Sequence, residues 1–193
     1  MSTLKEIREK YLNSPKDFTK DIESRIGIRI QKVDIIDDTF IFKRLINNLE
    51  NNELDKIIVT PPFVIFTLVE DINGYTLKIH NCLTFNMGKE GLVRISPTED
   101  NKIELTRIEV AEPRKGTGSL IMEFLLDYIK STLGFIPPIL AELTGAVGLG
   151  ETYRATPINK QKKFFKKHGF VVIADNKHLI KMERPFINVH LNI

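Results

Sequence analysis

The sequence predicts one α/β domain with a mixed, mostly antiparallel central sheet and helices on both faces. Strand-like stretches rich in β-branched and aromatic residues follow one another closely in the first half of the chain. In the second half, strand-like stretches alternate with stretches of helical periodicity. No repeat, low-complexity run or Gly/Ser linker divides the 193 residues. The expected order is therefore helix, β-meander and then β-α-β-α-β-β within a single domain, 1–193.

The composition is that of a soluble globular protein. Apolar residues make up 42% of the chain, charged residues 27%, and the net charge is +3. No segment approaches the roughly 18 consecutive apolar residues of a membrane helix, and residues 1–16 are too charged for a secretory signal. The only cysteine, Cys82, excludes an intramolecular disulfide. We expect a cytoplasmic protein, with no membrane partner and no charge-driven binding of nucleic acid.

The first half begins with a helix and continues mainly as strands. Asn13-Ser14-Pro15 ends the first helix. Pro61 and Pro62 interrupt an apolar run, so the strand proper is expected to begin near Phe63. Asn73-Gly74 forms a hairpin turn, because both residues tolerate positive φ. The expected elements are helix 3–12, strand 28–36, helix 40–51 and strands 57–69, 75–85 and 92–95.

The second half holds the clearest helix, 118–132, whose apolar face includes Leu120, Phe124 and Leu125. Gly134 follows as its cap. Residues 184–193 either add an edge strand or reach a second subunit, so a homodimer is one expected assembly. The other expected elements are strands 103–110 and 139–143, a loop at 144–157, helix 158–168, and strands 170–174 and 177–183.

The strand at 103–110 contains a slip in its apolar alternation. Ile103 and Leu105 keep a period of two, and so do Ile108 and Val110, but the two pairs are out of phase. A β-bulge near Thr106 would return both pairs to the core face. Bulges leave backbone groups unpaired, and such groups can bind an extended ligand. The alternative is that this part of the strand lies at a sheet edge.

A basic, glycine-containing loop connects this strand to the clearest helix. In Pro-Arg-Lys-Gly-Thr-Gly-Ser, residues 113–119, the glycines allow N–H groups to converge, and the helix start adds further donors and a positive dipole end. Arg114 and Lys115 contribute full charges. The order of strand, basic residues, GxG and helix predicts a pyrophosphate site, although GxG alone could be only a tight turn. The P-loop motif and the GxGxxG dinucleotide motif are both absent.

Two stretches resemble the GCN5-related N-acetyltransferase (GNAT) family. IEVAEPRKGTGSLIMEFLLDYIKSTLG is similar to its acyl-CoA signature, and NKQKKFFKKHGFVVI is similar to its next motif. The resemblance covers about residues 103–183. It implies the acyl-CoA N-acyltransferase fold, acetyl-CoA as co-substrate, an amine acceptor and no metal. Residues 103–183 would bind acyl-CoA, and residues 1–102 would lie on the acceptor side. The implied cofactor-binding residues are Ile108, Glu109, Val110, Arg114, Lys115, Gly116, Thr117, Gly118, Ser119 and Phe165.

The chain departs from the family pattern at two positions. The family places Arg or Gln three residues before the first loop glycine, where this chain has Pro113, so Arg114 is displaced by one. The family's frequent general-acid Tyr is replaced by Phe165, which cannot protonate a thiolate. Tyr153, in the long loop, is a candidate substitute, with a rim position as its alternative. These departures keep a second hypothesis open, a catalytically weak CoA-binding or regulatory interaction module.

The general base must be chosen among carboxylates. Glu104 points away from Ile103 and Leu105 on the bulged strand, where some members of the family carry a catalytic Glu, and is the first candidate. Glu142 is expected at the same cleft, and Glu109 could bind substrate. Each could instead be a solvated or ion-paired strand residue. Together they predict a negative pocket suited to a cationic amine.

The remaining polar groups have simpler interpretations. The helix at 158–168 carries five lysines, expected to form a solvated face, contact CoA phosphates or bind nucleic acid in a salt-dependent manner. The four histidines have no metal-ligand spacing. Cys82 is expected to be a small core residue.

Overall fold

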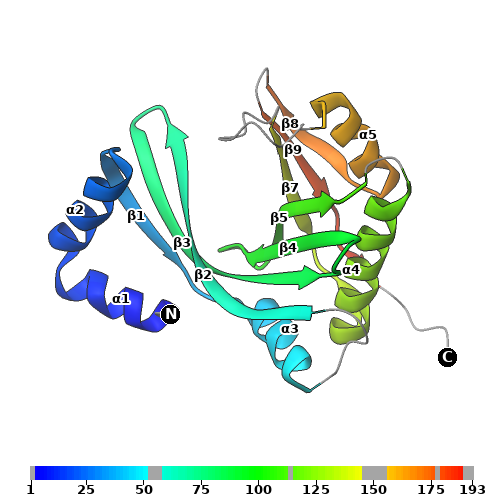
Figure 1. Cartoon of the computed structure of the whole chain (residues 1–193), viewed down its shortest axis with the longest axis horizontal. Coiled ribbons are helices and arrows are strands. Elements are labelled where there is room, and N and C mark those ends of the chain that lie inside the picture. Colours follow the sequence, from blue (N-terminus) through cyan, green and yellow to red (C-terminus); the bar gives the residue numbers. More distant parts are fainter. Residues whose placement is uncertain (1–2, 52–57, 113–114, 145–155, 177–178, 189–193) are drawn as a thin grey trace.

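The computed structural model of the chain describes residues 3–51, 58–112, 115–144, 156–176 and 179–188. Among these residues, eight strands form one sheet in the order β1-β3-β4-β5-β7-β9-β8, with β2 on the other edge of β3 (Figure 1). The pairs β1–β3 and β5–β7 are parallel and the others antiparallel, which confirms the predicted mixed, mostly antiparallel sheet. The strands are β1 (Ile30–Ile36), β2 (Ile58–Asp71), β3 (Gly74–Asn86), β4 (Gly91–Pro97), β5 (Ile103–Val110), β7 (Ile139–Thr144), β8 (Val171–Asp175) and β9 (Leu179–Arg184).

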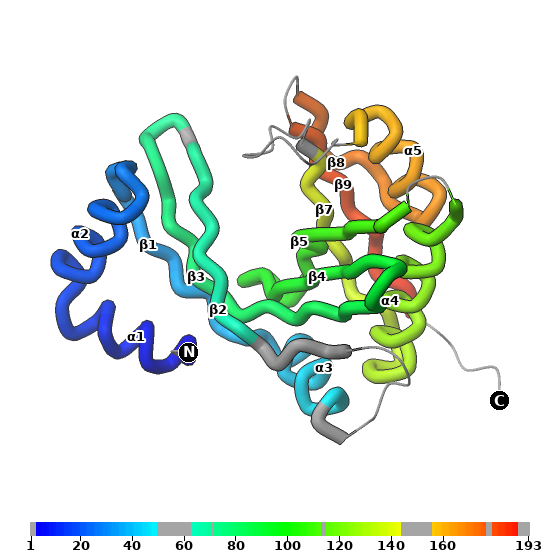
Figure 2. Tube along the Cα trace, in the orientation of Figure 1, coloured from blue at the N-terminus to red at the C-terminus, as the bar shows by residue number. Residues whose placement is uncertain are grey.

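The described helices pack on one face of this sheet, whereas the prediction placed helices on both. The sheet bends, and the helices follow the outside of the bend (Figures 1 and 2). Strand β3 shows why all these helices lie on the same face. Its odd-numbered residues contact the first two helices through Leu77 and Ile79, and the main core through Leu83 and Phe85. The helices are α1 (Leu4–Asn13), α2 (Pro15–Ile26), α3 (Phe40–Asn51), α4 (Thr117–Leu133) and α5 (Ile158–Lys167).

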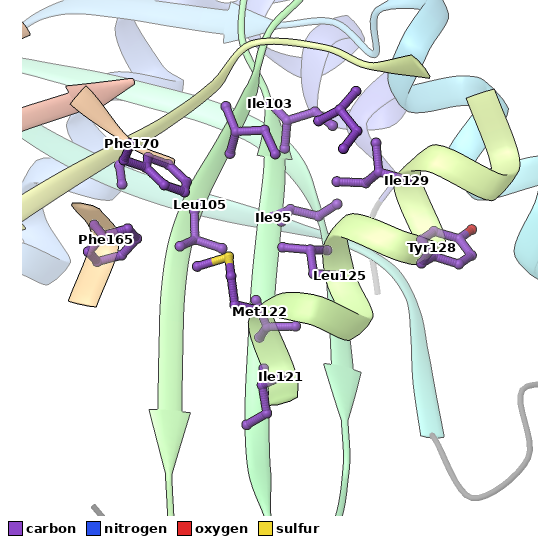
Figure 3. Packing of buried hydrophobic residues seen from close by; sticks show 14 of the residues in the cluster. Ile95, Ile103, Leu105, Ile121, Met122, Leu125, Tyr128, Ile129, Phe165 and Phe170 are labelled. Atoms are coloured by element: carbon purple, nitrogen blue, oxygen red, sulfur yellow. The ribbon is translucent and has the colours of Figure 1, made fainter. Parts of the chain in front are cut away.

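The main hydrophobic core lies between α4 and the central strands. Met122 and Leu125 of α4 are fully buried, and they pack over Ile95, Ile103 and Leu105 (Figure 3). Their spacing along α4 is the helical periodicity seen in the sequence. The helix ends at Gly134, where φ is 79° and the cap N–H donates to the Lys130 carbonyl, as predicted. This packing fixes the start of α4 beside the end of β5.

A second apolar cluster joins α1 and α2 to the strands β1 and β3. Helix α2 lies outside the predicted elements. Pro15 occupies its first turn, where a missing N–H costs nothing. Phe18 faces the cluster, and Gly27 ends the helix with φ 69°. Three sequence features are typical of such a helix: the Ser-Pro start, the Phe18–Ile22 spacing and the terminal Gly27.

Strand β2 begins earlier than predicted. It starts at Ile58 and runs through Pro61 and Pro62, which the sequence reasoning took as a break. The register against β3 shifts between Thr60 and Phe63, so an irregularity absorbs both prolines. This is possible because β2 is an edge strand, where a missing N–H can face away from the sheet. The predicted Asp71–Gly74 hairpin turn is confirmed, with φ 125° at Gly74.

Two short strands form a separate two-stranded sheet. β6 (Phe135–Ile136) pairs with β10 (Ile187–Asn188), so the expected extra strand exists but adds to this small sheet rather than the main one. Phe135 and Phe186 contact each other with ring centroids 5.6 Å apart. Of the helices in the described ranges, none has the length and hydropathy to cross a bilayer.

Candidate active site

The parallel strands β5 and β7 stay together for only three residues. Ile103, Glu104 and Leu105 pair with 139–141, whereas β5 continues to Val110 and β7 to Thr144. The part of β5 beyond Leu105 therefore forms no strand pairing with β7 along the edge that faces it. An unpaired parallel edge presents N–H and C=O groups in the arrangement that an extended ligand can bind.

The bulge predicted in β5 is present where the strands part. Leu105 pairs with Ile95 and Arg107 with Arg94, so Thr106 has no register partner. The Thr106 hydroxyl donates to the Arg94 carbonyl at 3.3 Å. After the bulge Ile108 and Val110 return to the helix-covered face and pack against the main core. The slip in the apolar alternation is thereby explained.

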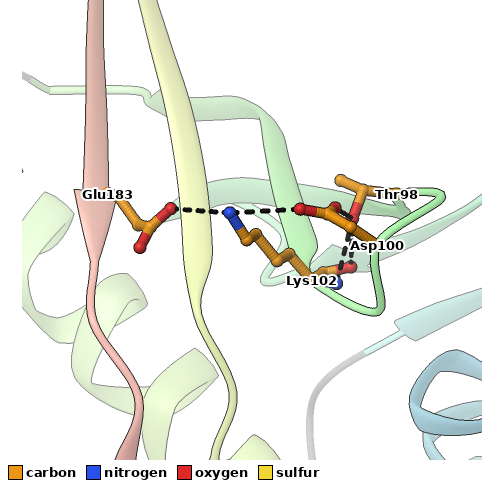
Figure 4. Close-up of polar contacts among 4 residues, drawn as sticks. All are labelled: Thr98, Asp100, Lys102 and Glu183. Atoms are coloured by element: carbon orange, nitrogen blue, oxygen red, sulfur yellow. Dashed lines mark hydrogen bonds and ion pairs between the residues drawn. The ribbon is translucent and has the colours of Figure 1, made fainter. Parts of the chain in front are cut away.

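A polar cluster lies at the closed end of the parting strands, where β5 and β7 are still paired (Figure 4). Lys102 Nζ lies 3.0 Å from Glu183 Oε2 on β9 and 3.1 Å from Asp100 Oδ2. The Lys102 N–H donates to the Thr98 hydroxyl at 2.9 Å, which holds the β4–β5 turn. These contacts raise the pKa of Lys102, with Glu183 as the largest cause. The β4–β5 turn is thus tied across β7 to β9.

The start of α4 lies at the far end of β5. Gly116 precedes the helix with φ 85° and supplies no side-chain cap. Ser119 N–H and Leu120 N–H both donate to the Gly116 carbonyl, so the earlier N–H groups of the first turn point out of the helix end. A Cβ on Gly118 would lie 3.3 Å from Phe164 Cε2 and 3.5 Å from Val110 Cγ1. Glycine therefore lets the helix start approach β5 and α5 closely.

Basic groups from α5 reach this helix start. Lys167 Nζ donates to Ser119 Oγ at 3.1 Å, and His168 Nε2 lies 3.2 Å from the same oxygen. Burial lowers the pKa of His168, and the nearby Lys167 charge lowers it further. A lysine, a serine hydroxyl and free N–H groups at a helix N-terminus form an arrangement that suits a phosphate.

Of the two basic residues predicted for the loop before α4, the structure describes one. Lys115 forms an ion pair with Glu112, whereas Arg114 lies outside the described residues. On α5, Lys162 pairs with Asp175, and Lys163 is exposed to solvent. The lysines of this helix are therefore distributed between an ion pair, the helix start of α4 and solvent.

Glu104 and Glu142 meet on the face of the sheet opposite the helices. Burial raises the pKa of Glu104, and the charge of Glu142 raises it further, while Lys78 and Lys181 act in the opposite direction. Glu142 Oε1 lies 2.7 Å from Lys181 Nζ, and both groups are half-exposed. A half-buried carboxylate with a raised pKa can exchange a proton closer to neutral pH than an ordinary one. Glu109 is separate, in an ion pair with Arg107.

The concave face also holds residues that sequence reasoning did not single out. Ser96 pairs in register with Glu104, is fully buried, and has no hydrogen-bond partner for its hydroxyl within the described structure. His80 is 4% exposed, its Nδ1 lies 3.2 Å from the Asn81 carbonyl, and burial lowers its pKa, which favours a neutral ring. Alternate polar residues along β3, from Thr76 to Thr84, were the signal for this face.

The structure describes one of the two aromatic residues predicted for the site, Phe165, and not the other, Tyr153. Phe165 is 5% exposed and belongs to the main core, where its ring lies 5.3 Å from Phe164 and 5.0 Å from Phe170. Its contact with a cofactor stays a prediction. Tyr153 lies outside the described residues.

The single cysteine is a core residue, as predicted. Cys82 is fully buried, and burial raises the pKa of its thiol to about 11, so it stays protonated. In the described part of the chain, no group of three or more potential ligands is placed to hold a metal ion.

Neither a protein-family model nor a curated protein matches this chain. Solved structures do match it. The Campylobacter jejuni N-acetyltransferase PseH in complex with acetyl coenzyme A is 13% identical, with a TM-score of 0.40 over 53% of this chain and 66% of that one. Ard1 from Thermoplasma volcanium is 18% identical, with a TM-score of 0.39 over 53% of this chain and 68% of its own.

A Bacillus subtilis acetyltransferase in complex with CoA is also similar. It is 18% identical, with a TM-score of 0.38 over 56% of this chain and 78% of its own. The similarity to each of these three structures covers about half of this chain.

Proposed function

We propose that this chain is an acetyl-CoA-dependent N-acetyltransferase that transfers an acetyl group to an amine by direct attack. The observation that carries the proposal is the bulged strand β5, which parts from β7 and ends beside the free N-terminus of α4. A strand edge suits the amide-rich pantetheine arm, and the helix start with Lys167 and Ser119 suits the pyrophosphate.

The reaction follows from these positions. The acceptor nitrogen attacks the thioester carbonyl carbon, the C–S bond breaks, and the sulfur leaves as the CoA thiolate. A backbone N–H at or near Val110 polarises the carbonyl oxygen. Glu104 takes the proton from the amine, directly or through a water molecule. Solvent or Tyr153 returns a proton to the thiolate, since Phe165 has no acidic group.

The acceptor would be a cationic amine. Glu104 and Glu142 place two carboxylates at the parting of the strands, with Lys181 paired to Glu142, and the proximity of Lys78 to Glu104 brings the first half of the chain to the same site. This supports an acceptor side in residues 1–102. Acetyl-CoA and the amine are then the substrates.

The first test separates chemistry from binding. Glu104→Gln is expected to lower kcat by roughly 10²-fold or more, the usual contribution of a general base, while the Kd for acetyl-CoA changes little. Glu99→Gln is the control, because Glu99 is exposed in the turn between β4 and β5 and has no role in the proposed site. Steady-state release of CoA with a panel of amines and calorimetric titration give the two values. Unchanged turnover in Glu104→Gln would remove its role as base.

The second test addresses the pyrophosphate position. Lys167→Met is expected to weaken acetyl-CoA binding by about tenfold, the scale of one charge-assisted contact, without weakening binding of S-acetylpantetheine, which lacks phosphates. Lys163→Met, on the exposed side of the same helix, is the control. The assignment fails if the wild-type protein does not bind acetyl-CoA at high micromolar concentration.

A second candidate function is a CoA-binding regulatory module without turnover. The phenyl side chain of Phe165 favours it, because this position offers no acid to the leaving thiolate. Acetyl-CoA binding without CoA release, for every amine in the panel, would identify the module.

A further inference from the structure

Strand β2 is a long edge of the main sheet, and its segment 63–69 carries no charged residue. It pairs with β3 over its length, while the other edge of β3 is shared by β1 and β4. Backbone groups of alternate residues face opposite sides of a strand, so half of those in 63–69 point away from β3. In the described sheet nothing pairs with this edge. Such an edge is a ready template for another strand.

The other edges carry features that limit pairing. β1 contains Lys32 and Asp34 and packs against α2. β8 has only five residues and ends at Asp175. Residues 63–69 of β2, Phe-Val-Ile-Phe-Thr-Leu-Val, contain neither charge nor proline. Phe66 is 49% exposed and Val69 is 37% exposed.

We propose that two copies of this chain associate by antiparallel pairing of their β2 strands about a two-fold axis at Phe66. The pairing would extend both sheets into one continuous sheet. An isologous contact of this kind closes on itself and stops at two copies.

The sequence of β2 is complementary to itself in this register. Phe66 lies opposite Phe66 of the second copy, Val64 opposite Leu68, and Phe63 opposite Val69, so every pair but that of Ile65 with Thr67 is fully apolar. Val64 and Leu68 already pack against the α1–α2 cluster, which leaves the Phe66 ring at the edge between them. The two Phe66 rings would cover each other.

Charge and proline select the antiparallel orientation. In this register Glu70 and Asp71 lie opposite Pro62 and Pro61 of the second copy, so the acidic groups do not oppose each other. Because proline has no N–H, the ladder ends there. Parallel pairing would instead place each acidic residue beside its own copy, which is unfavourable.

The experiment measures the oligomeric state of the full chain and of charge variants by sedimentation equilibrium. The wild-type protein is expected to dimerise, and Phe66→Lys to raise the dimer Kd at least tenfold, because two like charges meet at the axis. Ile72→Lys is the control, since Ile72 is fully exposed at the hairpin tip outside the paired residues. Circular dichroism verifies that each variant is folded.

A mixing experiment tests the register. Phe66→Lys and Phe66→Glu are each expected to be monomeric, and their equimolar mixture is expected to form a salt-sensitive heterodimer. Phe66→Cys provides a second measurement that needs no added charge: mild oxidation should cross-link it, but not Ile72→Cys.

Three outcomes would overturn the proposal. These are a wild-type protein that stays monomeric up to about 100 µM, a Phe66→Lys variant that dimerises like the wild type, and Ile72→Cys cross-linking as readily as Phe66→Cys. Pairing of β2 with a strand of another protein would appear as the first of these.

Discussion

The two faces of the bent sheet are built in different ways. The helix-covered face is apolar, with fully buried residues such as Phe85, Ile95 and Ile103. The concave face has buried polar groups instead, including His80 and Ser96, together with the partly exposed Glu104 and Glu142. Apolar packing on one face supplies stability, whereas buried polar groups on the other cost stability and mark the place where chemistry is expected.

The largest expected effect compares two neighbours on opposite faces. Phe85→Ala should lower the free energy of unfolding by roughly 3–5 kcal/mol, because it leaves a cavity among Phe124 and Tyr128. Thr84→Ala should cost only about 1 kcal/mol, mainly through loss of the 3.1 Å bond from Arg94 Nε. Urea unfolding of both variants measures the difference. Equal losses would contradict the division between the faces.

Glu104 should make stability depend on pH. Its folded pKa is raised above the ordinary 4.5, so the folded state favours the protonated form, and its contribution to stability falls as pH rises from about 4.5 through the folded pKa. Glu104→Gln removes this charge and should be more stable than the wild type by about 1 kcal/mol at pH 7. Below pH 4.5 the two proteins should unfold alike. A difference that does not change with pH would be inconsistent with a raised pKa.

Ser96 tests whether an unpartnered polar group lowers stability. Its buried hydroxyl has no partner in the described structure, so Ser96→Ala should raise the free energy of unfolding by up to about 1 kcal/mol. Thermal unfolding measures the change. A loss of stability would mean that the hydroxyl is satisfied in solution, for example by a water molecule.

The smallest effect is expected at the closed end of the strands. Lys102→Met breaks the contacts to Glu183 and Asp100, which are partly exposed, so the loss should be about 1 kcal/mol or less. High salt should reduce the loss further. A loss above about 3 kcal/mol would show that this cluster holds the strands in place.

The comparison of the faces also explains which predictions succeeded. Periodicity located α4, and the slip between Leu105 and Ile108 located the bulge, because both depend on which residues of one local segment face the core. The edge position of β2 could not be predicted, and without it Pro61 and Pro62 indicated a break. Helix α2 was not predicted, because Pro15 is a stop signal for α1 and at the same time the first residue of α2.

The candidate site combines residues from near and distant parts of the chain. Local order singled out the loop and helix start at 116–119, strand position and the family resemblance singled out Glu104 and Glu142, and the roles of all of them stay predictions. The contacts of Lys167 and His168 with Ser119, and the proximity of Lys78 to Glu104, join segments far apart in the chain. The alternation of residues along a strand predicts which side chains point away from the core, but it does not predict which residues they contact on the other face.

The sequence by itself determined the position of α4, the bulge in β5 and the glycine loop before α4, because these follow from side-chain alternation and backbone freedom within short segments. Only the tertiary structure decided that the described helices share one face, that β5 and β7 part after three residues, and that β2 is an open edge. These features depend on which distant strands pair and how far the sheet bends, and that is settled by packing of the whole core.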